Sequence, residues 1–254
     1  MLNLGLLQPS ALLSLRAIPG LDRMEWVADG TLAIGAMATQ ADLAALGVKG
    51  AHSVLIQAAR QMAHPVIRNF GTVGGSLCHA DPAADLPPAA VAAGANFSVH
   101  GPNGTRELDA DGFFVDYLTT ALEEGELLTG ITVPAPAPAS AGHYYKYARV
   151  DGDYATVSVA VTLAAEDGVC TSARIVLGSC APVPLRVADA DAALVGSALA
   201  NCTVDAAAVS RTARLLQEAA DPIDDVRGSA DYRRRLIPGL VARAVARAAA
   251  DIRI

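Results

Sequence analysis

Cysteine is scarce in this chain of 254 residues. It has only four cysteines, Cys78, Cys170, Cys180 and Cys202, and no two of them form a Cys-x-x-Cys pair. Iron–sulfur clusters and structural zinc sites need several cysteines at close, regular spacing. The spacing therefore argues against a cluster or a zinc site held by this chain alone. We expect reduced, structural thiols, as is usual for a cytoplasmic protein.

Positive charge and long apolar runs are also scarce. The chain has 19 Lys and Arg against 26 Asp and Glu, which gives a formal net charge of −7. Binding to a nucleic-acid backbone needs basic patches, so this balance argues against it. No apolar run reaches the roughly 18 to 20 residues that a membrane span requires, and no basic-then-apolar segment opens the chain. We therefore expect a cytoplasmic protein without a membrane span.

Apolar residues, by contrast, are plentiful. They make up 52% of the chain, enough to bury a sizeable core, and many are alanines, which favour closely packed helices. The length fits one large domain or two small ones. The segment from Ala135 to Ser140 alternates Pro and Ala and can continue neither a helix nor a central strand, so we predict a domain boundary there. The predicted domains are residues 1–136 and 137–254.

The spacing of apolar residues predicts an α+β fold in both domains. In the first domain we expect strands at 32–36 and 127–133, a hairpin made of 96–100 and 105–108, and helices at 40–46 and 53–62, the second of them ended by Pro65. In the second domain we expect a three-stranded antiparallel sheet and three helical stretches, with strands at 143–149, 156–163 and 173–178 and helices at 187–200, 204–220 and 230–250. Pro238-Gly239 kinks the last helix or breaks it in two.

The stretch from Ile67 to Leu86 has the strongest functional pattern. Its middle, Gly71-Thr72-Val73-Gly74-Gly75-Ser76, has no side chain at three of six positions. Glycines leave backbone N–H groups uncovered and permit positive φ, and successive uncovered N–H groups form a concave anion site. Thr72 and Ser76 add hydroxyl donors, and Asp85 could accept from sugar hydroxyls. The alternative is a glycine-rich turn without a ligand.

The whole string Arg-Asn-x-Gly-Thr-x-Gly-Gly-x-Leu-x-x-Ala-Asp-Pro-Ala-Ala-Asp-Leu, residues 68–86, resembles the second flavin-binding signature of a known family. This family comprises the FAD-binding medium subunits of molybdenum hydroxylases of the carbon monoxide and xanthine dehydrogenase type. The resemblance implies an FAD-binding domain of the vanillyl-alcohol-oxidase-like (PCMH) type. It also implies that Thr72, Val73, Gly74, Gly75 and Ser76 wrap the FAD phosphates and that Asp85 holds sugar or ribityl hydroxyls.

Further motifs extend the resemblance over nearly the whole chain. Ile34-Gly35-Ala36-Met37-Ala38-Thr39 resembles a signature of the first domain, although Thr39 is equally well explained as a helix N-cap. The resemblance puts Met62 near the flavin adenine, and a core methionine is the alternative. In the second domain the matching segments are Tyr145–Arg149, Gly152–Ala155 and Asp225–Arg233.

The same resemblance suggests residues near the flavin ring. It puts Lys146 near the ring, where a cation stabilises the anionic reduced flavin; a solvated surface lysine is the alternative. Tyr154 would cover one face of the ring. Leu128 would pack against it, unless it is a plain core leucine. Asp153 would influence NAD⁺ docking or serve as a turn residue.

Two other groups suggest no catalytic residue. His79 is more typical of a hydrogen-bonded structural histidine than of a catalyst. Arg227, Arg233, Arg234 and Arg235 are expected to form a solvated helix face or a subunit contact.

One departure from the family stands out. Its members carry a first glycine loop of the type Ala-Gly-Gly-x-Ser-Leu, which does not occur in this chain, and Met1–Leu6 resembles the segment just after that loop. We therefore expect the 254-residue chain expressed alone to be largely flavin-free.

The implied function is that of a flavin subunit in a larger complex. Electrons would pass from the [2Fe–2S] clusters of a small partner through FAD to an external acceptor, with substrate oxidised on a molybdopterin-containing large partner. The expected assembly is a dimer of heterotrimers. The alternative is a flavin-free structural or regulatory subunit of such a complex. The sequence identifies neither the substrate nor the acceptor.

Overall fold

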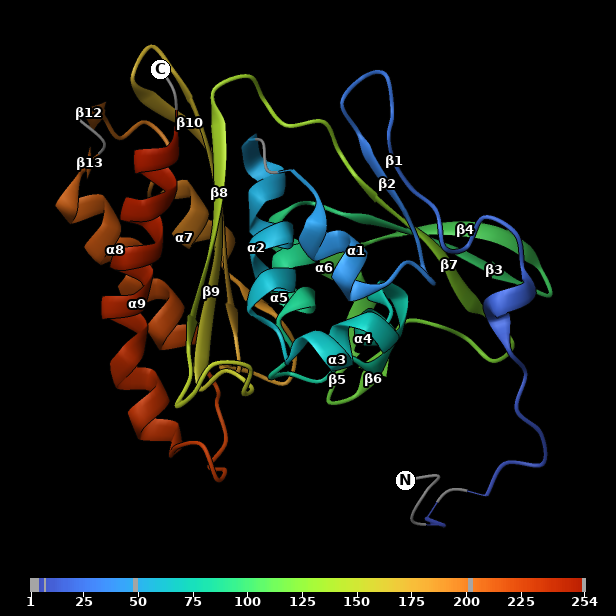
Figure 1. The fold of residues 1–254 in the computed structure, drawn as a ribbon. Coiled ribbons are helices and arrows are strands. Elements are labelled where there is room, and N and C mark those ends of the chain that lie inside the picture. Colours follow the sequence, from blue (N-terminus) through green and yellow to red (C-terminus); the bar gives the residue numbers. More distant parts are fainter. Residues whose placement is uncertain (1–4, 7, 48–49, 201–202, 253–254) are drawn as a thin grey trace.

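The described residues of the chain form two main sheets, one of five and one of four strands, with a layer of helices between them, as Figure 1 shows for the computed structural model. The structure describes residues 5–6, 8–47, 50–200 and 203–252. Met1–Leu4 and Cys202, which the sequence analysis used, lie outside the described residues. Within the described part, no helix combines the length and apolar character needed to cross a membrane.

The first sheet has five antiparallel strands in the order β1-β2-β7-β3-β4. They are β1 (Met24–Trp26), β2 (Leu32–Gly35), β3 (Asn96–Gly101), β4 (Gly104–Asp109) and β7 (Leu127–Val133). The predicted strands and the predicted hairpin are confirmed. Gly104 turns the hairpin at a φ of 107°, which a side chain would strain. A one-turn helix, α6 (Ala110–Phe113), and a small ribbon of β5 (Phe114–Asp116) and β6 (Thr119–Thr120) follow β4.

Short helices pack between the two sheets (Figure 1). They are α1 (Gln40–Ala45), the 3-10 turn η3 (Gly50–His52), α2 (Ser53–Gln61), α3 (Pro65–Phe70), α4 (Val73–His79) and α5 (Leu86–Ala92); another 3-10 turn, η2 (Leu15–Ala17), precedes β1. Thr39 is the N-cap of α1 in a capping box with Asp42. The prediction that Pro65 ends α2 is wrong. Pro65 begins α3 instead, at a position where the N–H that proline lacks would have no helical partner.

The second sheet is antiparallel in the order β11-β10-β9-β8. Its strands are β8 (Ser140–Tyr147), β9 (Val157–Glu166), β10 (Val169–Gly178) and the two-residue β11 (Leu185–Arg186), which the sequence analysis did not predict. Strand β9 is buried on both faces. Val157, Val159 and Val161 belong to the core of the second domain, whereas Ala160 belongs to the core of the first. The continuous apolar run of β9 follows from this double burial.

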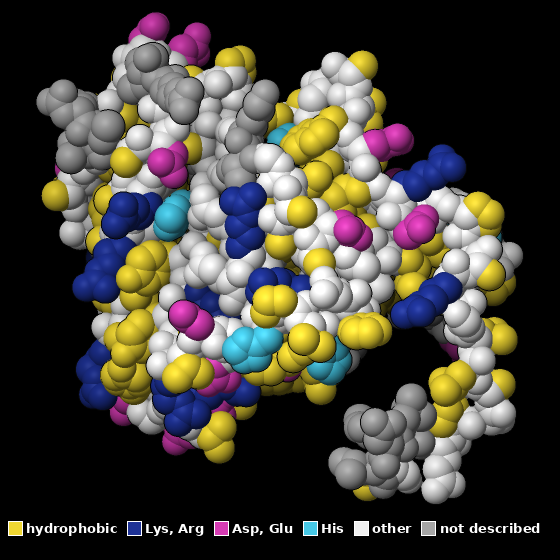
Figure 2. All heavy atoms as spheres, viewed as in Figure 1, with side chains coloured by type: hydrophobic (Ala, Val, Ile, Leu, Met, Phe, Trp, Pro, Cys, Tyr) yellow, Lys and Arg dark blue, Asp and Glu magenta, His cyan; other side chains and the backbone are white. Residues whose placement is uncertain are grey.

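The C-terminal helices cover the other face of the second sheet (Figure 1). They are α8 (Ala206–Ala219) and α9 (Ala230–Asp251), preceded by α7 (Ala188–Ala192) and the short pair β12 (Leu199–Ala200) and β13 (Thr203–Val204). The predicted helix at 187–200 therefore ends early, and α9 runs unbroken through Pro238. Figure 2 shows Lys and Arg side chains along the outer side of α9.

Arg233 corrects one expectation about this arginine group. Its side chain is only 3% exposed, so it does not belong to a solvated helix face. It donates to the carbonyl of Thr156 and pairs with Asp225. The buried guanidinium is tolerated because Asp225 balances its charge and its two terminal nitrogens have acceptors, although its buried Nε has no acceptor among the described residues.

A polar stripe on α2 joins the two domains. Ser53, Gln57 and Gln61 recur every fourth residue, so they share one face of the helix. Ser53 Oγ accepts from the N–H of Gly142 at 2.9 Å, and the Gln57 amide accepts from the N–H of Tyr144 at 3.0 Å. The Gln61 amide donates to the carbonyl of Tyr144 at 3.0 Å. Strand β8 is the last strand of its sheet, so these side chains satisfy the backbone groups that a neighbouring strand would otherwise pair.

Candidate functional site

A cavity of about 400 Å³ opens between the helices of the first domain and the loop that connects β8 to β9. The first domain contributes residues from α1 to the start of α5, and the loop contributes three residues. The lining residues are Gln40, Met62, Ala63, Ile67, Gly71, Thr72, Gly75, Ser76, His79, Ala84, Asp85, Gly152, Asp153 and Tyr154. Five of the nine predicted site residues are therefore brought together here.

The glycine motif forms the start of helix α4 rather than an open loop. Thr72 is the N-cap, and its hydroxyl accepts from the N–H of Gly75 at 3.0 Å. The N–H groups of Val73 and Gly74 donate to the carbonyls of Ala38 and Ala36, both at 2.9 Å. The expected row of uncovered N–H groups is thus absent at these three residues, because the end of β2 and the N-cap hydroxyl take them up.

The glycines also differ from expectation in their conformation. None of Gly71, Gly74 and Gly75 has a positive φ. Glycine is required instead by close contact at Gly74, where a Cβ would lie 2.6 Å from the Cβ of Ala36, whereas one at Gly71 would lie 2.7 Å from the amide oxygen at the end of the Gln40 side chain. At Gly75 the only near atom is Thr72 Oγ1, at 2.7 Å, and the rest of the space belongs to the cavity.

A buried ion pair links Asp85, which lines this cavity, to Lys146 of the second domain. Lys146 Nζ lies 2.9 Å from Asp85 Oδ2, and each side chain is only 5% exposed. Tyr144 Oη donates to Asp85 Oδ1 at 2.6 Å, and Lys146 also donates to the carbonyl of Gln61 at 3.1 Å. Burial raises the pKa of Asp85, against the opposing effect of Lys146 and of both hydrogen bonds. Both oxygens of Asp85 are therefore already bound by the protein.

Tyr154 stands at the edge of the cavity and is 43% exposed. Its backbone N–H donates to Asp153 Oδ1 at 2.8 Å, which fits the interpretation of Asp153 as a turn residue. Burial, together with Asp81, raises the pKa of the Tyr154 hydroxyl, and Arg227 opposes this shift. The guanidinium carbon of Arg227 lies 4.9 Å from the centre of the Tyr154 ring.

Some of the predicted residues lie away from the cavity lining. Val73 and Leu128 are buried in the core of the first domain, at 1% and 5% exposure, and Gly74 packs against Ala36. Lys146 lines a neighbouring cavity instead. Their roles at the flavin stay predictions.

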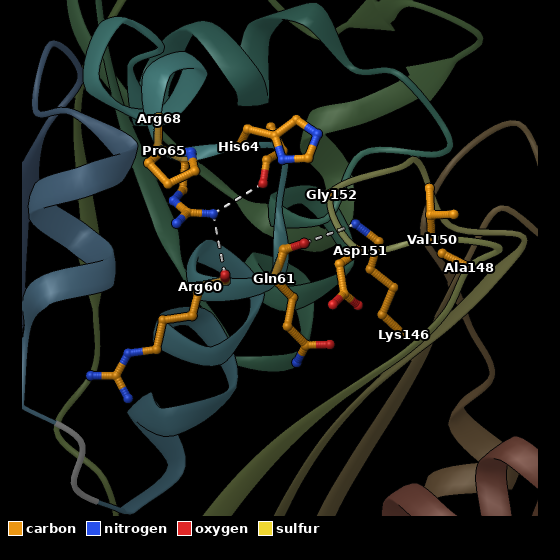
Figure 3. A pocket seen from close by; sticks show the side chains of 11 residues that line it. Arg60, Gln61, His64, Pro65, Arg68, Lys146, Ala148, Val150, Asp151 and Gly152 are labelled. Carbon is orange, nitrogen blue, oxygen red and sulfur yellow. Dashed lines mark hydrogen bonds between the residues drawn. The ribbon is translucent and has the colours of Figure 1, made fainter.

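That neighbouring cavity, of about 460 Å³, is shown in Figure 3. Ala63 and Gly152 line both cavities, so the tip of the β8–β9 loop lies between them. Gly152 has a φ of 81°, and a Cβ there would lie 2.7 Å from the His64 ring. The Arg68 guanidinium donates to the carbonyls of Met62 at 2.8 Å and Ala63 at 3.0 Å, which fixes the chain on the first-domain side.

Sequence reasoning missed Gln40 as a site residue. Gln40 follows the Thr39 cap directly, lines the first cavity and is 7% exposed. Its buried amide oxygen has no hydrogen-bond donor among the described residues. The signal was its position next to the Ile34–Thr39 signature, but a glutamine at the start of a helix is not distinctive by itself. His79 also lines the cavity, with a side chain that is 60% exposed.

The described residues form no metal site and contain no activated thiol. Their His, Cys, Asp and Glu side chains form no group of three that could hold a metal ion. Cys78, Cys170 and Cys180 are free. Burial raises the pKa of the Cys78 thiol to about 11 and that of Cys180 to about 12, so neither thiol is activated.

Comparison with known proteins bears on the whole chain. A family model described as "FAD binding domain in molybdopterin dehydrogenase" matches residues 1–136, and one described as "CO dehydrogenase flavoprotein C-terminal domain" matches residues 142–248. The chain is 36% identical over 246 residues to the carbon monoxide dehydrogenase medium chain of Hydrogenophaga pseudoflava. It is also 36% identical over 246 residues to the nicotine 6-hydroxylase medium subunit of Paenarthrobacter nicotinovorans. Each alignment covers 96% of this chain and 84% of the relative.

A solved structure has the same fold. A carbon monoxide dehydrogenase from Hydrogenophaga pseudoflava, which lacks the Mo-pyranopterin moiety of the molybdenum cofactor, superposes with a TM-score of 0.87 at 37% identity. The match covers 94% of this chain and 81% of that chain. The similarity therefore extends across both domains.

Proposed function

Because the chain belongs to the FAD-binding medium subunits of carbon monoxide and xanthine dehydrogenase-type molybdenum hydroxylases, we propose that it passes electrons from [2Fe–2S] clusters of a partner subunit through FAD to an external acceptor. FAD is the cofactor of this oxidoreductase subunit, and it supplies the exchange between single electrons and electron pairs. The observation that carries the proposal is the cavity at which Thr72, Gly75, Ser76, Asp85 and Tyr154 converge.

The residues of the cavity suit a flavin dinucleotide. Its volume of about 400 Å³ lies in the usual range of ligand sites, roughly 300 to 1,000 Å³. Met62, Ile67 and Ala84 provide an apolar wall for a ring system, and Thr72 and Ser76 provide hydroxyl donors. The buried amide oxygen of Gln40 has no donor among the described residues, and a sugar hydroxyl would supply one.

We assign the following roles to the residues of this chain. Thr72 and Ser76 bind phosphate oxygens at the start of α4, and Gly75 leaves room for them. Val73 and Gly74 act indirectly, because they fix α4 against the end of β2. Asp85 lines the flavin cavity and holds the Lys146 ammonium beside it in a buried pair, so that the cation lies one residue away from the flavin cavity. Tyr154 covers one face of the ring and limits access of the acceptor.

The surface beside the cavity supports a complex. Val66, Ile67 and Phe70 of α3 are 70%, 55% and 73% exposed, and Ile67 also lines the cavity. Figure 2 shows hydrophobic side chains on this face of the molecule. Exposed apolar patches of this kind mark contact sites. We propose that this face contacts the iron–sulfur subunit, in an assembly that also holds a molybdopterin subunit.

Co-expression with the candidate iron–sulfur and molybdopterin subunits encoded by neighbouring genes tests the proposal. We expect the three chains to elute together from a size-exclusion column, with about one FAD per copy of this chain. Reduction of the iron–sulfur subunit should then bleach the absorbance band near ~450 nm that is expected of oxidised flavin. Co-elution without flavin would favour a structural or regulatory subunit. A monomer that oxidises substrate unaided would indicate a stand-alone flavoenzyme and overturn the proposal.

A further inference from the structure

The segment from Asp225 to Arg233 matches a family motif, but the flavin roles described so far leave it unused. The segment makes a tight turn in which Asp225 and Gly228 exchange backbone hydrogen bonds at 3.1 and 3.2 Å. Ser229 then caps α9 by accepting from the N–H of Tyr232 at 3.2 Å. These local bonds make the turn rigid, so its side chains have fixed directions.

Asp225 is the centre of an ion network within this turn. Its carboxylate accepts from the backbone N–H of Arg227 at 2.8 Å and from Arg227 Nη1 at 3.0 Å. The other partner is the guanidinium of Arg233, which is nearly completely buried. One carboxylate therefore holds two guanidinium groups beside each other.

Arg233 links this turn to the end of the β8–β9 loop. Its Nη1 donates to the carbonyl of Thr156, two residues after Tyr154. The carbonyl of Ala155 accepts from Ser179 Oγ at 3.0 Å, and the N–H of Thr156 donates to the carbonyl of Tyr147 at 2.7 Å. The backbone that follows Tyr154 is thus held from three sides.

Arg227 acts on the ring itself. Tyr154 lines the flavin cavity, whereas Arg227 lines a separate cavity of about 210 Å³ that it shares with Asp81, Tyr117 and Asp225. The Arg227 guanidinium lies 4.9 Å from the centre of the Tyr154 ring, so this contact joins a residue that lines one cavity to a residue that lines the other. A guanidinium in this position attracts the ring through its quadrupole.

We propose that Arg227, fixed through Asp225 by the buried Arg233, positions the Tyr154 ring as the wall of the flavin cavity and so sets how freely an acceptor reaches the flavin. Arg227 touches no part of the flavin cavity, so it is a positioning residue. The proposal rests on the proposed function in one respect, namely that FAD occupies the cavity that Tyr154 lines.

Flavin fluorescence in the FAD-loaded complex tests the effect on the flavin, because a phenol ring in contact with an isoalloxazine quenches its emission. The variant Arg227→Gln keeps the Asp225–Arg233 pair but removes the cation. Loss of a half-exposed cation–π contact should lower the population of the Tyr154 ring conformation that lines the cavity, roughly two- to fivefold relative to its other conformations. We expect brighter emission at unchanged FAD content, with Tyr154→Leu as the upper limit and near-normal emission for Arg227→Lys.

A matched control and a flavin-independent measurement separate the possible failures. Arg235→Gln removes an exposed arginine of α9, the helix that follows the Arg227 turn, and should change nothing. In the chain without FAD, NMR should show upfield-shifted Arg227 side-chain signals that lose their shift in Tyr154→Leu. Normal emission in Arg227→Gln, or unshifted Arg227 signals, would overturn the proposal. If the Arg227 signals are shifted but the flavin emission is unchanged even in Tyr154→Leu, then Arg227 contacts Tyr154 but Tyr154 does not contact the flavin. That result would overturn the role proposed for Tyr154.

Discussion

At the scale of single residues, a side chain would meet a different neighbour at each glycine of the Gly71–Gly75 segment. Gly74 is required because the backbone and Cβ of Ala36 lie where its Cβ would stand, whereas a Cβ at Gly71 would meet only the end of the Gln40 side chain. Gly75 meets only the Thr72 hydroxyl and otherwise faces the cavity. A side chain at Gly75 therefore disturbs the Thr72 hydroxyl and the cavity, one at Gly71 displaces the Gln40 amide, and one at Gly74 disturbs the packing of α4 against Ala36.

Gly75→Val should abolish or strongly reduce FAD binding, because a branched side chain would fill the space beside the phosphate-binding hydroxyls. The measurement is the FAD content per chain in the purified complex, with the melting temperature recorded beside it. Gly239→Val is a suitable control, since Gly239 also lies in a helix and a Cβ there meets no atom within 4 Å. Full FAD content in Gly75→Val would refute the assignment of the phosphate site.

At the scale of elements, helix α9 passes through Pro238 without a break. Proline has no N–H and therefore leaves the carbonyl of Arg234 without its helical partner. The side-chain amide of Gln217 in α8 donates to that carbonyl at 2.9 Å. The carbonyl is thus bound by the neighbouring helix, and this bond joins α8 to α9. Because the donor comes from another helix, the local sequence around Pro238 could not decide between a kink and a break.

A double-mutant cycle on Gln217 and Pro238 tests this explanation. Gln217→Leu should lower the free energy of unfolding by about 1 kcal/mol in the natural background, because a half-buried carbonyl loses its donor. In the Pro238→Ala background the alanine N–H supplies the helical bond, so the same change should cost much less. Urea unfolding of the four proteins gives the coupling energy. Equal costs in both backgrounds would mean that the Gln217 bond does not compensate for the proline.

At the scale of the whole molecule, a buried histidine, His52, and a half-buried one, His143, link stability to pH. His52 is 2% exposed, and its Nε2 lies 2.9 Å from the carbonyl of Pro134 in the connection between the domains. Burial lowers the pKa of His52, against the opposing hydrogen bonds, and burial likewise lowers the pKa of His143. Both imidazoles are therefore neutral in the folded protein at a pH at which the unfolded chain already binds protons.

The free energy of unfolding should therefore fall as the pH drops below the unfolded histidine value of about 6.5. A fully buried imidazole contributes at most ~1.4 kcal/mol per pH unit. Asp85 opposes this trend because burial raises its pKa, so the comparison needs variants. His52→Gln should show a smaller loss between pH 7.5 and 5.5 than the natural chain, whereas His100→Gln, which removes an exposed imidazole, should not. Identical slopes for all three proteins would exclude His52 as a source.

A second window lies at lower pH. Hydrogen bonds from Arg106 and from the backbone of Glu123 lower the pKa of Glu126 to about 2. Its contribution is therefore complete above the ordinary glutamate value and disappears only as the pH falls toward 2. The histidine window can thus be measured without interference from this ion pair.

Local pattern determined much of this protein. The period-two runs of the first sheet, the hairpin glycines, the boundaries of α1, α2 and α8 and the flavin signature from Arg68 to Leu86 were all predictable, because each depends on residues that are neighbours along the chain. The motif also predicted the correct cofactor and family. The motif could not predict that the backbone N–H groups of this segment are used within the protein. Those of Val73 and Gly74 donate to the carbonyls of Ala38 and Ala36, and that of Gly75 donates to the Thr72 hydroxyl.

The tertiary structure decided which side chains meet across the two domains. Asp85 and Lys146 are 61 residues apart and form a buried pair, and Gln57 reaches the edge of β8, 87 residues away. Arg233 belongs to a run of arginines that is typical of a solvated helix face, but its side chain is buried and binds the carbonyl of Thr156 in the segment after Tyr154. No local pattern specifies such contacts, because burial and pairing depend on how distant segments pack, and it is this packing that forms the cavity and sets its charges.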